Sequence, residues 1–204
     1  MATTQPATPA LTPEQAQKQA RILQDGSGFE AYQFASEVAG ADIPAMQARV
    51  LAVGDSWDLF HFARDVPGAD WASLQVQLLR GNSIRFIACF AREIPGADLA
   101  TCQARVLEAG DSIDVLQFAK IPGVDVGQLQ ARMLKVGSPL HAYWFAFNVP
   151  ESDVLALYAY AQAQNFKGMD SLERNHFAKL RDAHLLRTEA VQDDDAGADS
   201  PTPA

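Results

Sequence analysis

The sequence has few of the residues that mark a disulfide framework or a membrane protein. Only two of its 204 residues are cysteines, Cys89 and Cys102, and we expect them to act as small packing residues rather than as a disulfide framework. No run approaches the roughly 18 apolar residues of a membrane span. The first ten residues lack the basic and apolar segments of a signal peptide. We therefore expect a cytoplasmic protein with no membrane partner, and secretion into a host cell stays open as an alternative.

Motifs for catalysis, cofactor binding and metal binding are also missing. The chain has no Gly-rich phosphate loop after a strand-like segment and no nucleophile-elbow pattern. Glu173 and His176 are spaced so that two ligands would share one helix face. Carboxylate-bridged metal sites need a second such pair, which the sequence does not offer. We expect no catalytic residue, no metal and no cofactor, and hence a protein that is not an enzyme.

Basic residues are fewer than acidic residues in this chain. The chain has 16 Lys and Arg against 25 Asp and Glu, a formal charge of -9. An acidic surface repels phosphate, so neither nucleic acid nor an anionic membrane is the expected main partner. With 48% hydrophobic and 20% charged residues, the middle of the chain is expected to be globular, with enough residues for a sizeable core.

One sequence module occurs five times along the chain. Each copy begins at a Gln and carries a Phe-Ala pair fifteen residues later, so that successive pairs lie 28, 28, 28 and 27 residues apart. The glutamines are Gln19, Gln47, Gln75, Gln103 and Gln130, and the pairs are Phe34-Ala35, Phe62-Ala63, Phe90-Ala91, Phe118-Ala119 and Phe145-Ala146. A fixed period of a few tens of residues is typical of a solenoid, in which each unit buries its apolar face against the next.

Each module contains two helix boundaries. In the second copy, Gly54 is followed by Asp55, which predicts a left-handed helix end and then the N-cap of a new helix. A Pro-Gly turn follows, and Asp70 after it predicts a second N-cap. Each module is therefore predicted to be an αα-hairpin. The predicted fold is all-α, a right-handed α-solenoid of five αα-hairpin repeats with helical caps at both ends.

The two ends differ from the repeats. Thr12, Pro13 and Gln15 form the pattern of a capped first helix. C-terminal capping helices are predicted over 154–166 and 171–190, which makes 11–191 a single helical-repeat domain with repeats from 19, 47, 75, 103 and 130. Residues 1–10 and 192–204, rich in Thr, Pro, Ala and Asp, are predicted to be disordered tails, the second one acidic. We expect the protein to be a monomer.

Two polar columns accompany the repeat. The glutamines lie beside the predicted core, where a buried amide needs partners, and we expect them to bond to the adjacent turn or to the next Gln. Two residues later an Arg recurs, with Gln77 interrupting: Arg21, Arg49, Arg105 and Arg132. We expect these arginines to pair with the capping Asp of neighbouring copies. Contact with a phosphate backbone is the alternative.

Two variable columns suggest a binding surface. The third and seventh positions counted from the Ser or Asp cap read Phe29, Trp57, Arg85, Ile113, Leu140 and Gln33, His61, Cys89, Gln117, Trp144. Aromatic, His and Arg side chains are common in protein interfaces. We therefore predict partner binding by Trp57, His61, Arg64, Arg85 and Arg92, with Arg64 and Arg92 framing an aromatic anchor. Packing between repeats is the alternative.

The fourth copy is one residue short. The deletion lies between Phe118-Ala119 and Ile121-Pro122-Gly123, and the missing residue corresponds to about 100° of helical turn. The Ile must still reach the core. We predict a shortened helix or altered turn at Lys120, a change in repeat-to-repeat rotation, and a groove near residues 119–126 that could bind a partner.

The tandem hairpins resemble HEAT, armadillo and tetratricopeptide solenoids, although the unit here is shorter. The phrases Phe-Ala-x-x-Val-x-Gly-Ala-Asp and Leu-Gln-x-x-Val-Leu-x-x-Gly-Asp look like short repeats of bacterial proteins over residues 19–157. Residues 11–15 resemble the start of the DNA-reading repeats of transcription-activator-like effectors, but the period and the charge differ. We expect a non-enzymatic bacterial scaffold that binds a protein or peptide. The alternatives are nucleic-acid binding along the Arg column and a secreted bacterial effector.

Overall fold

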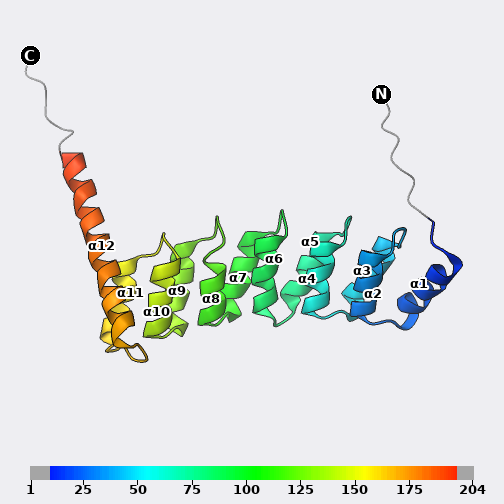
Figure 1. Ribbon diagram of the computed structural model, residues 1–204, viewed down its shortest axis with the longest axis horizontal. Coiled ribbons are helices and arrows are strands. Elements are labelled where there is room, and N and C mark those ends of the chain that lie inside the picture. The colour runs from blue at the N-terminus through cyan, green and yellow to red at the C-terminus, as the bar shows by residue number, and fades with distance from the viewer. Residues whose placement is uncertain (1–9, 197–204) are drawn as a thin grey trace, which may run out of the picture. The chain divides into compact units, whose positions relative to one another are not determined.

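The structure is a computed structural model that describes residues 10–196, and their side chains as far as residue 188. These residues form twelve α-helices and no strand (Figure 1), which confirms the all-α class. The chain divides into two compact units, unit 1 ending at Arg105 and unit 2 beginning at Val106. Residues 1–9 and 197–204 of the predicted tails lie outside the described residues.

Unit 1 contains six complete helices and most of a seventh. They are α1 (Pro13–Asp25), α2 (Gly28–Glu37), α3 (Ile43–Val53), α4 (Ser56–Asp65), α5 (Trp71–Arg80), α6 (Ile84–Glu93) and α7 (Leu99–Ala109), which runs across the unit boundary. The glutamines of the repeat lie in odd-numbered helices and the Phe-Ala pairs in even-numbered ones. Helices α2, α4 and α6 contact one another in sequence, and α2 and α4 pack against the odd-numbered helix that follows each of them.

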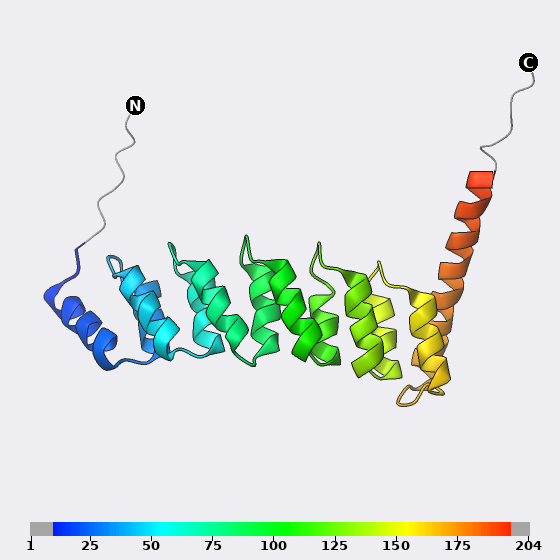
Figure 2. The same ribbon diagram turned by 180° about the vertical axis from the view of Figure 1, so that it is seen from behind.

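Unit 2 is arranged around α10. Its helices are α8 (Ser112–Phe118), α9 (Val126–Val136), α10 (Pro139–Asn148), α11 (Val154–Ala163) and α12 (Ser171–Ala196), and α10 contacts all four others. Figure 2 shows α12 beside α11 and continuing past its end. Phe177 of α12 is fully buried, so this helix covers an apolar face, as predicted.

Both C-terminal helices differ from their predicted limits. α11 ends at Ala163 rather than at 166 because the chain turns through Asn165 and Phe166, whose φ angles of 51° and 50° are left-handed. α12 continues to Ala196 rather than to 190. Residues 192–196, predicted to belong to the acidic tail, are therefore helical.

The recurring Phe is the centre of the packing in both units. Phe34, Phe62 and Phe90 in unit 1 and Phe118 and Phe145 in unit 2 are all at most 2% exposed. Each such burial stabilises the fold by about 1.5–3 kcal/mol. Because these helices have only seven to ten residues, they depend on this packing for their stability.

The predicted helix starts are confirmed with one exception. Thr12 forms the predicted capping box with Gln15, and the side chains of Asp55 and Asp70 accept hydrogen bonds from the free amides of α4 and α5. Ser83, at the start of α6, makes no such bond. The third residue of α6 is Phe86, whereas α2, α4 and α8 have an acid there that completes a capping box.

The expectation of a left-handed glycine after each Gln helix is wrong. Gly54 has φ -73° and ψ 150°, which is extended backbone. The left-handed glycines lie in the other turn, as at Gly68 with φ 82°. Space is what requires a glycine at 54, because a Cβ there would lie 2.6 Å from the Val50 carbonyl oxygen. Gly54 is followed directly by the N-cap residue Asp55, whose backbone is also extended, so this junction needs no left-handed residue.

The Gln column is a structural ladder, as predicted. The Gln47 amide donates to the Asp70 carbonyl at 3.0 Å, and its Oε1 accepts from the Asp70 N–H at 2.8 Å. Gln75 bonds in the same way to Asp98, and Gln130 to Asp153. Each of these side chains thus joins its helix to the turn that leads into the next odd-numbered helix.

Arg49 and Arg132 bond to backbone carbonyls rather than to capping aspartates as expected. Arg49 donates to the Gly26 carbonyl at 2.7 Å, and Arg132 donates to the Gly110 carbonyl at 2.9 Å. Carbonyls at a helix C-terminus lack intrahelical partners, and a guanidinium can supply the missing donors. Tyr160 of α11 takes this role for the fifth copy, because its hydroxyl donates to the Gly137 carbonyl at 2.6 Å.

Candidate partner-binding site

Six aromatic rings meet on the even-numbered helices of unit 1. Helix α2 contributes Phe29 and Tyr32, α4 contributes Trp57, Phe60 and His61, and α6 contributes Phe86. We call this group the ring cluster. Within one helix the rings are spaced by three or four residues, which places them on one face. Contacts between α2, α4 and α6 then bring the three sets together.

Trp57 lies at the centre of the ring cluster. Its ring stacks on His61 with centroids 3.8 Å apart, and it meets Tyr32 edge-on at 5.5 Å and Phe29 at 5.7 Å. The His61 Nδ1 lies 2.8 Å from the Trp57 carbonyl oxygen, so this nitrogen carries the proton and donates. Both side chains are half-buried, while Phe29 is 49% exposed. The cluster therefore leaves part of its ring surface open to solvent, and the contacts between the rings fix the positions of these side chains.

A chain of polar contacts runs along one edge of the ring cluster. The Tyr32 hydroxyl donates to Asp65 at 2.9 Å, and Arg64 donates to the same carboxylate through two nitrogens at 2.7 and 2.9 Å. Arg64 also lies 3.6 Å from Glu93, which pairs with Arg92 at 2.7 Å. These contacts link α2, α4 and α6 through side chains that stay partly in solvent.

The pKa values of this edge follow from its contacts. The hydrogen bonds from Arg64 are the main cause that lowers the pKa of Asp65, and the same pair raises the pKa of Arg64. Burial is the main cause that raises the pKa of Tyr32, with the bond to Asp65 adding to it. The hydroxyl thus stays protonated and remains a donor at neutral pH. The edge carries both signs of charge in compensating pairs.

The structure brings together four of the five predicted site residues, since Arg92 also belongs to the polar edge through its pair with Glu93. Trp57, His61 and Arg64 lie within the ring cluster or at its edge, whereas Arg85 is exposed on α6 and makes no ring contact among the described residues. The framing of an aromatic anchor by Arg64 and Arg92 stays a prediction. Arg64 lies over the Phe60 ring, 5.1 Å from its centroid, and Arg92 is held by Glu93.

Four of the six rings are not among the predicted binding residues, although one of them, Phe29, lies in the variable third-position column. Tyr32 and Phe60 occupy the sixth position from the cap, next to the variable column that was recognised, and a recurring aromatic there is a readable signal. Phe86 stands at the repeat position that holds the capping acid in α2, α4 and α8. This replacement is also visible in the sequence, but only the packing of α4 on α6 shows that the ring joins the cluster.

The deletion in the fourth copy has the predicted local effect. Helix α8 has seven residues, whereas α2, α4, α6 and α10 have ten. Ile121 still reaches the core and is 7% exposed. A groove of about 220 Å³ lies here, lined by residues 119–123, Val126 and residues 148–151. The shortened helix and the groove near residues 119–126 are therefore confirmed.

A serine–histidine contact in unit 2 is the nearest arrangement to a catalytic pair. The Ser112 Oγ lies 2.8 Å from the His141 Nδ1. Ser112 is only 7% exposed and belongs to the first turn of α8, and a nucleophile must be reached by its substrate. We interpret the contact as a link between α8 and α10.

Metal and membrane sites are not evident in the described part of the chain. Within it, no three His, Cys, Asp or Glu side chains lie close enough together to hold a metal ion. No helix between residues 10 and 196 has both the length and the apolar composition needed to cross a bilayer. Comparison of the chain with protein-family models, with curated proteins and with solved structures found no match.

Proposed function

We propose that the five copies form an α-solenoid and that the chain is a non-enzymatic scaffold that binds a protein or peptide through the ring cluster. The observation that carries the proposal is the set of six rings on α2, α4 and α6, with Phe29 49% exposed and Trp57 half-buried. Aromatic side chains are enriched in the energetically dominant parts of protein interfaces.

The ring cluster is distinct from the core that holds the helices together. The core of unit 1 already contains Phe34, Phe62 and Phe90, none more than 2% exposed. Phe60, 3% exposed, connects the cluster to this core, whereas the other five rings are half-buried or exposed and leave apolar surface in water. Neighbouring exposed rings are a recognised mark of an interaction surface.

Helix α6 lacks a stabilising N-cap beside the ring cluster. Phe86 replaces the acid that would complete a capping box, and Ser83 makes no capping bond. A lost N-cap costs a helix about 0.5–2 kcal/mol. The Phe86 ring instead packs near Phe60, with ring centroids 5.9 Å apart, and extends the ring cluster onto a third helix. This exchange supports a role for the cluster beyond helix stability.

The surface favours a partner segment with an exposed apolar or aromatic anchor. Phe29 and Trp57 offer ring faces and edges, on which such an anchor packs with little loss of side-chain entropy. The bordering Arg64, Asp65 and Glu93 compensate one another. The anchor would therefore provide most of the affinity, and polar contacts at this edge would set its orientation.

Nucleic-acid binding along the Arg column receives no support from the contacts of its members. Arg49 and Arg132 donate to backbone carbonyls of the preceding copy, and Arg21 pairs with Glu30 at 2.9 Å. These contacts hold Arg49 and Arg132 against the backbone, where both side chains are only partly exposed, and the net charge of -9 opposes a phosphate backbone.

The test is peptide selection followed by alanine substitution. Twelve-residue peptides from a display library are selected on the full chain, and the Kd of the best is measured by fluorescence anisotropy. We expect Trp57→Ala to weaken binding about 30-fold, the equivalent of a 2 kcal/mol hot spot. Phe29→Ala, at a more exposed ring, should weaken it at least threefold.

Trp144→Ala is the matched control. Trp144 occupies the same repeat position as His61 but lies on α10 of unit 2, and it is 38% exposed. Circular dichroism verifies that each variant is folded. If Trp144→Ala weakens binding as much as Trp57→Ala, or if Phe29→Ala and Trp57→Ala both bind normally, the assignment of the ring cluster is wrong.

A further inference from the structure

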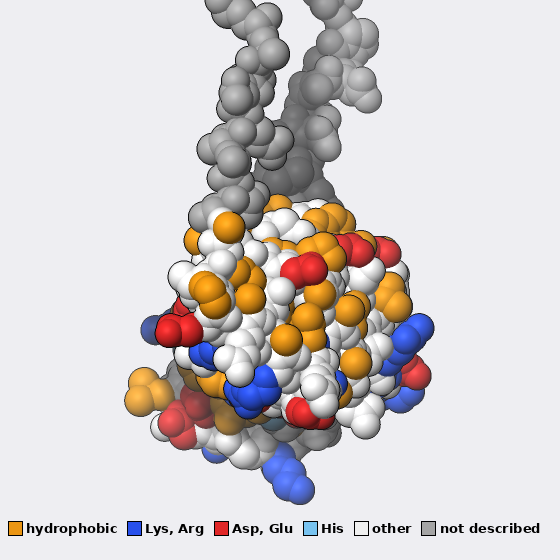
Figure 3. Space-filling model, turned by 90° about the vertical axis from the view of Figure 1, so that its right-hand side faces the viewer, with side chains coloured by type: hydrophobic (Ala, Val, Ile, Leu, Met, Phe, Trp, Pro, Cys, Tyr) orange, Lys and Arg blue, Asp and Glu red, His pale blue; other side chains and the backbone are white. Residues whose placement is uncertain are grey.

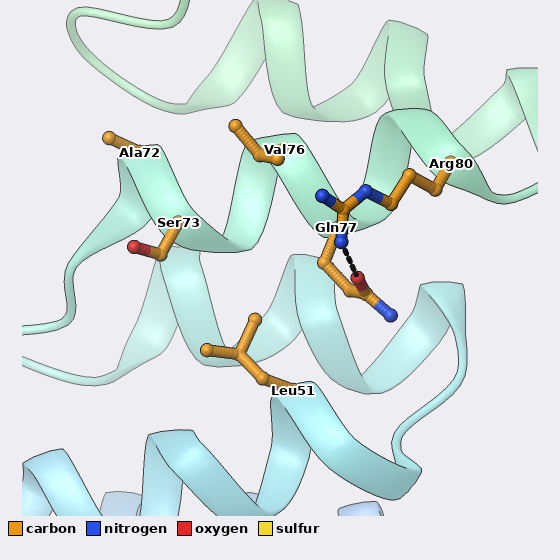
Figure 4. Close-up of a pocket in the computed structure, with 6 residues that line it drawn as sticks. All are labelled: Leu51, Ala72, Ser73, Val76, Gln77 and Arg80. Atoms are coloured by element: carbon orange, nitrogen blue, oxygen red, sulfur yellow. Dashed lines mark hydrogen bonds between the residues drawn. The ribbon is translucent and has the colours of Figure 1, made fainter.

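A second surface of unit 1 has the features of a separate binding site. It lies on the odd-numbered helices α3 and α5, whereas the ring cluster lies on even-numbered ones. An open groove of about 430 Å³ is lined there by Leu51, Ala72, Ser73, Val76, Gln77 and Arg80. Figure 4 shows Leu51 reaching from α3 towards α5, and the Arg80 side chain folding back along α5 to Gln77. The Arg80 guanidinium donates to the Gln77 Oε1 at 3.2 Å.

The groove lies where the third copy departs from the other four. Val76 stands where the others have Ala20, Ala48, Ala104 and Ala131. Gln77 stands where the others have the arginine of the Arg column, which in the second and fifth copies folds onto a backbone carbonyl of the preceding copy. Gln77 instead accepts from Arg80. Val76 on the apolar wall and Gln77 at the polar end are therefore particular to this copy, whereas Leu51 belongs to the second copy.

The groove combines an apolar wall with an available cation. Val76 is 53% exposed, and Leu51 is partly exposed across the groove from it. The Arg80 side chain is exposed, and no carboxylate of the described residues lies within 4 Å of it. An arginine held by a neutral amide keeps its charge and donors for an external carboxylate, which it can bind through two parallel hydrogen bonds.

The spacing along α5 selects the form of the ligand. Val76 and Arg80 lie one helical turn apart on α5, and the Arg80 guanidinium folds back to Gln77, so the charge and the apolar wall occupy adjacent parts of the groove. In an extended peptide, side chains two residues apart point to the same side and lie about 6.8 Å apart. An aliphatic residue followed two positions later by an acidic one therefore matches the apolar wall and the guanidinium at the same time.

We propose that this groove binds an extended acidic peptide segment with the pattern Leu-x-Asp, its leucine against Leu51 and Val76 and its carboxylate on Arg80. Charge complementarity supports this partner, because the ligand is anionic where the groove is cationic. The site does not depend on the ring cluster. The two surfaces together would let one chain hold two different segments.

The test uses two labelled peptides that differ in one charge. A fluorescein-labelled ten-residue peptide carries one Leu-Ser-Asp, and its partner carries Leu-Ser-Asn at the same place. By anisotropy at low salt, we expect the full chain to bind the Asp peptide at least tenfold more tightly than the Asn peptide. Arg80→Gln should abolish this preference, and Val76→Ala, which restores the residue of the other copies, should weaken binding severalfold.

Arg187→Gln provides the matched control. Arg187 is an exposed arginine of α12 in unit 2, so the substitution removes the same charge without changing a residue that lines the groove, and the preference should persist. Equal affinity for the two peptides, or equal losses in Arg80→Gln and Arg187→Gln, would overturn the proposal. Trp57→Ala, measured with the same two peptides, distinguishes the groove from the ring cluster. Loss of the Asp preference in that variant would also overturn the groove proposal, while normal binding supports it whatever the outcome for the ring cluster.

Discussion

Replacing Gln75 with Ala tests whether the Gln column holds consecutive copies together. Gln75 is 4% exposed on α5. Its amide donates to the Asp98 carbonyl at 3.1 Å, and its Oε1 accepts from the Asp98 N–H at 3.1 Å. The amide also lies 3.4 Å from the Cys102 Sγ. The alanine variant removes all three contacts and leaves two backbone groups in a partly buried turn without their partner.

The expected loss follows from these contacts. Each hydrogen bond contributes about 1 kcal/mol net, and an unsatisfied buried group costs about 1–3 kcal/mol. Water can reach part of the Asp98 turn because the Asp98 residue is exposed, so the lower values apply there. With a small contribution from the cavity, we expect the free energy of unfolding to fall by about 2–4 kcal/mol. This is a large share of the 5–15 kcal/mol typical of a folded domain.

Urea denaturation followed by circular dichroism measures the loss. Gln77→Ala is the control on the same helix, because Gln77 bonds only to the exposed Arg80, and we expect a change within about 0.5 kcal/mol. Gln75→Leu keeps most of the volume and separates the hydrogen bonds from the packing. Equal stability of the Gln75→Ala and Gln77→Ala variants would refute the structural role of the column.

Two further predictions concern the helix junctions and caps. Gly54→Ala should cost about 1–3 kcal/mol in a thermal melt, because its Cβ would lie 2.6 Å from the Val50 carbonyl oxygen. Gly127→Ala, within α9, is the control: its Cβ would lie 3.3 Å from the Oδ1 of the exposed Asp125 side chain, which can shift, so its cost should be well below that of Gly54→Ala. Hydrogen bonds from Thr101 lower the pKa of Asp98, so its stabilising contribution is present above the ordinary Asp pKa of about 3.9 and is lost as pH falls through the lower folded value. Asp98→Asn keeps a capping oxygen that does not titrate, and its urea midpoint should fall less than that of the parent between pH 6 and pH 2.5; equal falls would show that Asp98 does not contribute.

Much of the local structure was predictable because it depends on residues close together in the chain. The capping box at Thr12, the N-caps at Asp55 and Asp70 and the buried Phe of each copy all appear as expected. Such features need only a short polar side chain before a helix or an apolar residue at a fixed helical position. The deletion beside Lys120 was predictable for the same reason, since it changes the length of one helix.

The roles of the polar columns were predicted less well. The choice of the adjacent turn as the partner of the Gln column was correct, but Arg49 bonds a helix C-terminal carbonyl rather than a capping Asp. The Gly26 carbonyl lies 23 residues away from Arg49 along the chain. Which of these two kinds of group an arginine reaches depends on the offset between neighbouring helices, and a repeat pattern does not specify that offset.

The sequence alone determined that this chain is all-helical, where most of its helices begin, and which Phe residues form the core, because helix caps and helical periodicity are local properties. It also contained Trp57 and His61 as candidate binding residues. Only the tertiary structure decided that these join Phe86 in one ring cluster, and that Val76 and Arg80 line a groove with Leu51. These surfaces combine residues from helices whose distance and rotation are set by packing, so no segment of the sequence specifies them on its own.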